Sequence, residues 1–294
     1  MHVTDPWREP LVALGWTGAL RALATSNSKL VHLAELFGSQ RVVLKAPNYA
    51  RLSTSDAARV ERGLRYESAV LAIAGNETPH VPRLLAGDRE GRFLIRTFAD
   101  GCPLSDRQTQ QVSPQVLVAA LLQLAADLFP RFHRREPEPF IIRDFKPINL
   151  VWNEVDERLI LIDLGSVRPA SRARARTLER EPRLGSGRWL YWAPEQLLNQ
   201  AALPDQRADL FALAATAHFI LTGSAPFSNS DPSERTAFAN YLSEYPATVV
   251  GLRLAAASAG LPGDVTGFFE RCLHPAPEQR GRLKELEALL RGPG

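Results

Sequence analysis

Cysteine is scarce in this chain, and its scarcity limits the possible architectures. Only Cys102 and Cys272 occur among 294 residues. They stand far apart and form no metal-ligand pattern, so neither a disulfide framework nor a zinc site is expected. The sequence therefore predicts a protein of a reduced, cytoplasmic setting.

Long hydrophobic runs and a strong net charge are also missing. No apolar run approaches the length that crosses a bilayer, and the N-terminal MHVTDPWREP has no signal-peptide core, so no membrane segment is expected. The net charge of +3 is too weak to indicate a nucleic-acid partner. The apolar fraction of 45% is ordinary for a globular protein, and the length allows two lobes.

Lysine is rare although the chain is basic. Of the 35 basic residues only four are lysines: Lys29, Lys45, Lys146 and Lys284. A lysine is a compact point charge and an arginine a planar fork, so they are not interchangeable at a tight site. The few positions that keep lysine are therefore candidates for function.

The patterning predicts a β-rich first part and a helical second part. Three short runs within residues 19–47 and a hairpin within 81–98 have the character of strands. Residues 54–74 are predicted to be helical, with Thr54 or Ser55 as N-cap. Further helices are predicted at residues 114–134 and 208–223, and in the last sixty residues. A second hairpin, formed by NLVW and RLILID, is predicted between the helices at 114–134 and 208–223.

The segment IIRDFKPINLVWN places an unusual set of polar groups in one short loop between apolar runs: Arg143, Asp144, Lys146 and Asn149. Asp163 follows at the predicted end of a strand. Oxygen ligands of this kind are those that magnesium prefers. Lys45 lies on a strand predicted to be buried, where an unpaired ammonium is costly. Glu67 is its preferred partner, with Glu61 as the alternative.

Six motifs in this order resemble the eukaryotic-type Ser/Thr protein kinases, which bacteria also contain. VVLK resembles the strand that ends in the phosphate-binding lysine, RDFKPIN the catalytic loop, and DLG the metal-binding triplet. APE (193–195) resembles the end of the activation segment, ADLFALAATAHFILTGSAPF the buried central helix, and HPAPEQR the closing motif. Each motif is weak alone, but their order agrees over nearly the whole chain.

The resemblance implies an α+β, two-lobed protein-kinase-like fold over residues 1–294. The β-rich N-lobe would span about 1–98, the hinge 98–104 and the mainly helical C-lobe 105–294. It implies an enzyme that uses ATP and Mg²⁺ to phosphorylate a Ser/Thr-bearing protein or peptide. The implied catalytic residues are Asp144, Lys146, Lys45 and Glu67, and the implied metal ligands are Asn149 and Asp163. Asp144 would orient the substrate hydroxyl, and Lys146 would neutralise the γ-phosphate.

The phosphate loop departs from the family because it has no glycine. Aligning Val31 with the family's valine puts Ala24, Ser26 and Lys29 at the three glycine positions. Glycines let backbone amides approach phosphate closely, whereas serine and asparagine tolerate tight turns and offer donors. The expected nucleotide contacts are Ser26, Asn27, Ser28, Lys29, Val31 and Lys45. The alternative is a solvated loop that holds no phosphate.

Other positions carry expectations from the same resemblance. Ile142 replaces a structural histidine, and Arg96 falls at the position that guards the adenine pocket unless the register is shifted by one or two residues. Asp209 would anchor the catalytic-loop backbone, and His133 would cap the preceding helix. Arg280 would pair with Glu195 of the APE motif. Arg143 would bind a phosphate or acid of the activation segment, or form a surface ion pair.

The activation segment, residues 163–195, is rich in arginine. Its seven arginines are Arg168, Arg172, Arg174, Arg176, Arg180, Arg183 and Arg188. Because guanidinium groups bind carboxylates and phosphates, we expect a substrate that is acidic or already phosphorylated near its Ser/Thr. Alternatively, phosphorylation of Ser171 or Thr177 would fold the segment onto its own arginines, or the run is a solvated loop.

Two rival functions remain open from the sequence. One is a pseudokinase scaffold, which the missing glycines favour and the complete set of catalytic residues opposes. The other is a dedicated biosynthetic kinase that phosphorylates a precursor peptide before further modification. Small-molecule kinases of related fold are disfavoured, because they usually lack an APE-type segment.

Overall fold

A computed structural model describes residues 5–25, 28–106, 109–170, 188–197, 205–227 and 237–291. The chain divides into two compact units. Unit 1 contains the chain up to Asp100 together with Ile162–Ser166, and unit 2 contains Gly101–Leu161 and the chain from Val167 onward. The predicted limits of lobes and hinge stay predictions.

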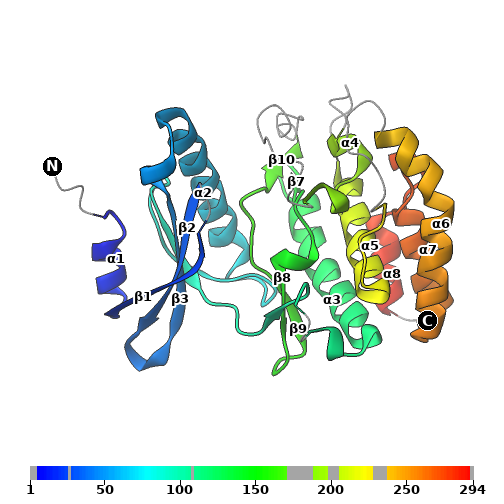
Figure 1. Cartoon of the computed structure of the whole chain (residues 1–294), viewed down its shortest axis with the longest axis horizontal. Helices are drawn as coiled ribbons and strands as arrows, with labels where there is room; N and C mark the ends of the chain where they lie inside the picture. Colours follow the sequence, from blue (N-terminus) through cyan, green and yellow to red (C-terminus); the bar gives the residue numbers. More distant parts are fainter. Residues whose placement is uncertain are drawn as a thin grey trace. The chain divides into compact units, whose positions relative to one another are not determined.

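Unit 1 is built on a five-stranded antiparallel sheet of order β1-β2-β3-β5-β4 (Figure 1). Its strands are β1 (Trp16–Thr25), β2 (Lys29–Leu36), β3 (Arg41–Pro47), β4 (Leu84–Gly87) and β5 (Leu94–Thr97). The three predicted runs and the predicted hairpin are therefore confirmed.

The two faces of this sheet differ in character, as the alternation of side chains along a strand requires. One face carries Leu36, Leu44 and Ile95, which pack with Leu11 of the short helix α1 (Arg8–Ala13) in an apolar core. Directly paired residues lie on the same face. The opposite face therefore carries Val31, Lys45 and Val43, together with Lys29 and Arg96.

In unit 1 the sequence analysis missed one helix and misplaced the N-cap of another. Helix α1 was not predicted, because six residues are too few to show a helical period. Helix α2 (Thr54–Ala74) has the predicted bounds, but its N-cap is Ser53 rather than Thr54 or Ser55. The Ser53 hydroxyl accepts a hydrogen bond of 3.2 Å from the Asp56 backbone N–H, which satisfies an otherwise unpaired donor of the first turn.

Unit 2 is mainly helical. Its helices are α3 (Pro114–His133), α4 (Pro194–Leu197), α5 (Gln206–Thr222), α6 (Ala237–Ser258), α7 (Gly263–Cys272) and α8 (Leu283–Arg291), and its short strands are β6 (Cys102–Pro103), β7 (Phe140–Ile141), β8 (Leu150–Asn153), β9 (Arg158–Leu161) and β10 (Arg168–Pro169). Every residue from 208 to 218 is buried, so α5 is the central helix of the unit. This burial and the β8–β9 hairpin confirm the predictions for this part of the chain.

The prediction that no apolar run approaches membrane-spanning length was too strong. Helix α3 has 20 residues and a mean hydropathy of 1.3 in its most apolar window, enough by length and composition to cross a bilayer. Most of that window is buried inside the protein, however. In this structure α3 serves as a core helix, packed against α5 and α8.

Candidate active site

The buried ammonium of Lys45 has the partner that was predicted for it. Lys45 Nζ lies 2.5 Å from Glu67 Oε1, and both side chains are almost wholly buried. The rival carboxylate, Glu61, instead accepts a hydrogen bond of 2.7 Å from the Tyr49 hydroxyl. Strand β3 and helix α2 thus hold a charge pair that fixes the position of the ammonium.

Asp163 lies beside this pair, two residues after the end of β9. Its Oδ1 accepts a hydrogen bond of 3.0 Å from the Gly165 backbone N–H and lies 3.6 Å from Lys45 Nζ. Burial raises the pKa of Asp163, but Lys45 and then Lys29 outweigh this effect and hold it below its ordinary value. The carboxylate is therefore ionised, as a metal ligand must be.

Lys29 also lies near this carboxylate. A Cβ placed on Gly165 would lie 3.1 Å from Asp163 Oδ1, 3.3 Å from Glu67 Oε2 and 3.6 Å from Lys29 Nζ. Gly165 thus leaves room for two carboxylates and an ammonium to converge. Of the other residues predicted to contact the nucleotide, Val31 pairs with Lys45 in the β2–β3 ladder, and the Ser28 carbonyl accepts from the Asn48 backbone N–H. Ser26 and Asn27 lie outside the described residues.

The second set of predicted residues lies in unit 2, in the loop between β7 and β8. Asp144 Oδ1 receives the Lys146 ammonium, and Asp144 Oδ2 accepts a hydrogen bond of 3.0 Å from Asn149 Nδ2. Asn149 Nδ2 also donates to the Asp144 backbone carbonyl at 2.9 Å. All three side chains are buried. The loop therefore brings together the carboxylate, the amine and the carboxamide.

This loop is held in place by groups that are distant in sequence. The Ile142 and Arg143 backbone N–H groups each donate a 2.8 Å hydrogen bond to the Asp209 carboxylate of α5. Arg143 has φ of 70°, a costly conformation for a residue with a side chain, which these bonds help to maintain. Phe145 packs edge-on against Phe129 of α3. Asp144 and Lys146 are thus presented from a rigid support.

The Asp209 anchor confirms one structural expectation and corrects another. His133 does not cap α3 with its side chain. Its Nε2 lies 2.8 Å from Asp209 Oδ2, so it supports the same carboxylate. Ile142, at the family's histidine position, is buried, as an apolar replacement allows. Arg143 is partly buried, and its pKa is lowered by burial and then by the neighbouring Arg168. Its pairing with a phosphate stays a prediction.

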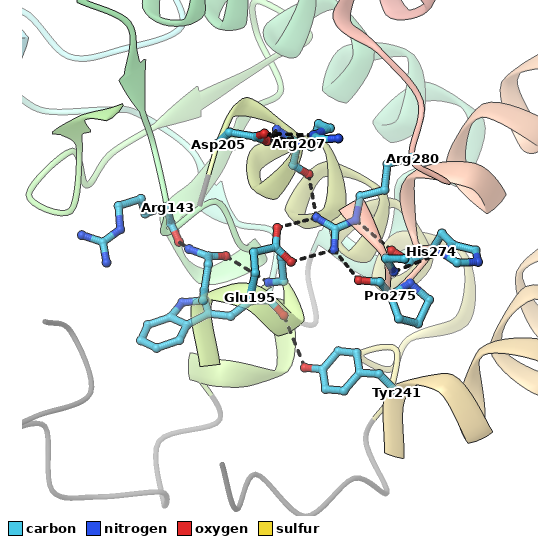
Figure 2. A network of polar contacts seen from close by, with 12 residues as sticks. Arg143, Glu195, Asp205, Arg207, Tyr241, His274, Pro275 and Arg280 are labelled. Atoms are coloured by element: carbon cyan, nitrogen blue, oxygen red, sulfur yellow. Dashed lines mark hydrogen bonds and ion pairs between the residues drawn. The ribbon is translucent and has the colours of Figure 1, made fainter. Parts of the chain in front are cut away.

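The APE motif is joined to the closing motif as expected. Arg280 donates to Glu195 Oε1 at 2.6 Å and to Oε2 at 2.7 Å (Figure 2). Gln196 then connects this region to the loop that contains Asp144, because its Nε2 donates to the Arg143 carbonyl at 3.2 Å. The rest of the activation segment, residues 171–187, lies outside the described residues, as do Ser171, Thr177 and five of the seven arginines.

The predicted metal ligands fit magnesium by the chemistry of their donor atoms. Asn149 uses its amide nitrogen for both of its hydrogen bonds in the loop, so its carbonyl oxygen is the atom that can face a cation. Asp163 offers carboxylate oxygens. Among the described residues no group of three or more His, Cys, Asp or Glu side chains is placed to hold a metal. Magnesium, however, usually binds one or two protein oxygens together with phosphates.

Comparison with known proteins identifies the class. The model of the protein kinase domain family matches residues 90–288. Serine/threonine-protein kinase C of Synechocystis sp. is 30% identical over 164 residues, 54% of this chain and 30% of that protein. Serine/threonine-protein kinase PknF of Mycobacterium tuberculosis is 30% identical over 203 residues, 63% of this chain and 41% of that protein.

The chain belongs to the protein kinase domain family. This confirms the resemblance drawn from the motifs. It also confirms the predicted fold class, with a β-sheet N-terminal region and a helical C-terminal region. The predicted enzyme class, a Ser/Thr protein kinase, is supported as well. The family in general uses ATP and Mg²⁺. The chain spans less than half the length of these curated relatives. The family match begins at Glu90, so Lys45 and Glu67 lie before it.

Proposed function

We propose that this chain is the catalytic domain of a Ser/Thr protein kinase that transfers the γ-phosphate of ATP to a hydroxyl of a protein or peptide. The observation that carries the proposal is the buried Asp144 carboxylate, which receives Lys146 on one oxygen and Asn149 on the other. Phosphoryl transfer depends mainly on positioning and charge neutralisation, and this loop supplies both.

Each residue has a defined task in this reaction. The substrate oxygen forms a bond to the γ-phosphorus while the bond to the β–γ bridging oxygen breaks and ADP leaves. Asp144 orients the hydroxyl and accepts its proton, since each carboxylate oxygen can accept more than one hydrogen bond. Lys146 neutralises the transferring phosphoryl group, and Lys45 holds the α- and β-phosphates while Glu67 positions its ammonium. Asn149 and Asp163 would each offer an oxygen to magnesium, which would supply further charge neutralisation.

Incubation with γ-labelled ATP, magnesium and a Ser/Thr peptide library tests this function. We expect phosphoserine or phosphothreonine in the products and no phosphotyrosine. Binding of nucleotide and magnesium without transfer to any peptide, or to the protein itself, would leave the pseudokinase. The dedicated biosynthetic kinase predicts transfer to a single peptide class rather than to many.

The substrate is proposed to be acidic near its Ser/Thr, because of the arginines of the activation segment. Replacing Arg172, Arg174 and Arg176 together by glutamine should raise KM for an acidic peptide several-fold and reduce its dependence on salt. Ser171→Ala with Thr177→Ala should lower activity only if the protein activates itself by phosphorylation. A library preference for basic or apolar flanks would contradict the acidic substrate.

Lys45→Arg should fail almost as completely as Lys45→Met. The ammonium lies only 2.5 Å from Glu67 in a buried site, where a planar guanidinium cannot reproduce a point charge. We expect kcat to fall by about 100-fold or more, the usual effect of losing one preorganised donor group. Glu67→Gln should act in the same direction but more mildly. Steady-state phosphorylation kinetics measure the effect, and full activity in Lys45→Arg would mean that the phosphates are held elsewhere.

A further inference from the structure

Unit 1 contains an excess of positive charge around Asp163. We call the group formed by Lys29, Lys45, Arg96, Glu67 and Asp163 the charge cluster. The three cationic residues lie on the same face of the sheet, because Val31 opposite Lys45 and Val43 opposite Arg96 fix the register of β2, β3 and β5. Two carboxylates therefore face three cations.

Lys29 belongs to this cluster by direct proximity. Its Nζ and Asp163 Oδ1 both lie within 4 Å of the place where a Cβ of Gly165 would stand. It is the second cation, after Lys45, that lowers the pKa of Asp163. The residue at the third glycine position of the phosphate loop thus brings an ammonium to the metal-binding carboxylate.

Arg96 adds a charge that the described residues do not fully satisfy. Its side chain is buried, with 4% of the residue's surface exposed, and it donates to the Thr97 carbonyl at 3.0 Å. Its Nε has no hydrogen-bond partner among the described residues, and neither does Glu67 Oε2. Burial lowers the pKa of Arg96, with Glu67 and Asp163 acting against it. A guanidinium nevertheless stays protonated in proteins.

Lys45, Glu67 and Arg96 are buried, whereas Lys29 and Asp163 are partly exposed. A net charge in such a partly buried site favours a counter-ion, and because the surplus here is positive, the favoured counter-ion is an anion. A cluster of Lys45, Glu67 and Asp163 alone carries one negative charge and calls for a metal cation before it accepts phosphates. With Lys29 and Arg96 added, the cluster carries one positive charge and attracts phosphate oxygens directly. Lys29 and Arg96 thus change the net charge of the cluster from negative to positive.

We propose that Lys29 and Arg96 supply positive charge that a divalent cation otherwise supplies, so that this domain binds nucleotide phosphates with little dependence on magnesium. The inference rests on the proposed function, because the anion is the phosphate chain of the nucleotide. It concerns binding only, and magnesium can still be required for transfer.

Calorimetric titration with ADP, once in MgCl₂ and once in EDTA, tests the inference on the whole chain. For the unmodified protein we expect the two dissociation constants to agree within about tenfold. Lys29→Met should weaken metal-free binding by about tenfold, the effect of losing one nearby charge, and should weaken Mg–ADP binding less. Lys29→Arg should retain most of the metal-free affinity, since it keeps the charge.

Lys284→Met is the matched control, because Lys284 is an exposed lysine of α8 outside the charge cluster. It should leave both constants unchanged. The inference is overturned if EDTA weakens binding to the unmodified protein more than about 100-fold, or if Lys29→Met leaves metal-free affinity unchanged or weakens both constants equally. Metal-free binding without any phosphoryl transfer would overturn only the proposed function. Absence of ADP binding in both buffers would overturn both proposals.

Discussion

Asp144→Asn should reduce kcat by about 1,000-fold or more while nucleotide affinity stays within a few-fold of its original value. The substitution keeps the shape of the side chain but removes the group that accepts the hydroxyl proton, and general-base catalysis typically contributes 10²- to 10⁴-fold. The substitution also removes the carboxylate charge that pairs with the Lys146 ammonium and holds it in place. Single-turnover phosphorylation and ADP titration measure the two quantities separately.

Asp156→Asn provides the control for this result. Asp156 lies in the turn between β8 and β9, pairs with Arg158 at 2.7 Å and is exposed. Its loss should leave both kcat and nucleotide affinity nearly unchanged. If Asp144→Asn retained more than a tenth of the original kcat, Asp144 would not be the group that orients the hydroxyl. The buried contacts with Lys146 and Asn149 would then have only a structural role.

The sequence predicted those site residues whose partners follow from local pattern. Lys45 was expected to be buried because of its place on β3, and a helix with two candidate carboxylates followed it. The loop from Arg143 to Asn149 could be recognised because its polar residues stand close together between apolar runs. In these cases the spacing of the residues along the chain largely determines which side chains lie close together.

The contacts that the sequence did not predict depend on packing between distant segments. His133 and Asp209 are 76 positions apart, and neither residue type reveals that they share a hydrogen bond. The approach of Lys29 to Asp163 requires the strand register and the return of residues 162–166 to unit 1. The place of Arg96 next to the adenine pocket depended on aligning residues 98–101 with the hinge, and it stays a prediction. What the sequence did not predict is the face of the sheet, since a shift of one residue turns a strand side chain to the opposite face. The ladder with β3 places Arg96 opposite Val43.

Replacement of Arg280 should destabilise unit 2 strongly. All five N–H groups of its guanidinium have acceptors: both Glu195 oxygens and the carbonyls of His274, Pro275 and Arg207 (Figure 2). The group also lies 5.0 Å from the ring centre of Phe211. The Arg280 side chain is fully buried. One side chain thus joins the APE motif, helix α5 and the closing motif.

Arg280→Met should lower the free energy of unfolding by about 3–5 kcal/mol, because it leaves Glu195 as a buried charge without its partner. Arg280→Lys should also be severe, since three ammonium donors cannot meet five acceptors in this fixed geometry. Urea unfolding, followed by circular dichroism, measures both changes. Replacing Glu195 by Gln as well as Arg280 by Met should recover part of the loss, because the buried charge disappears.

Arg253→Lys is the matched control for the buried pair. Arg253 of α6 also makes a bidentate contact, with Glu270 of α7, at 2.9 and 2.8 Å. However, 62% of the Arg253 side chain is exposed. Water and salt screen such a pair, so its loss should change the free energy of unfolding very little. The two arginines have the same kind of carboxylate contact and differ in burial and in their carbonyl contacts. Equal destabilisation by Arg280→Lys and Arg253→Lys would show that the Arg280 network contributes no more than an ordinary surface ion pair.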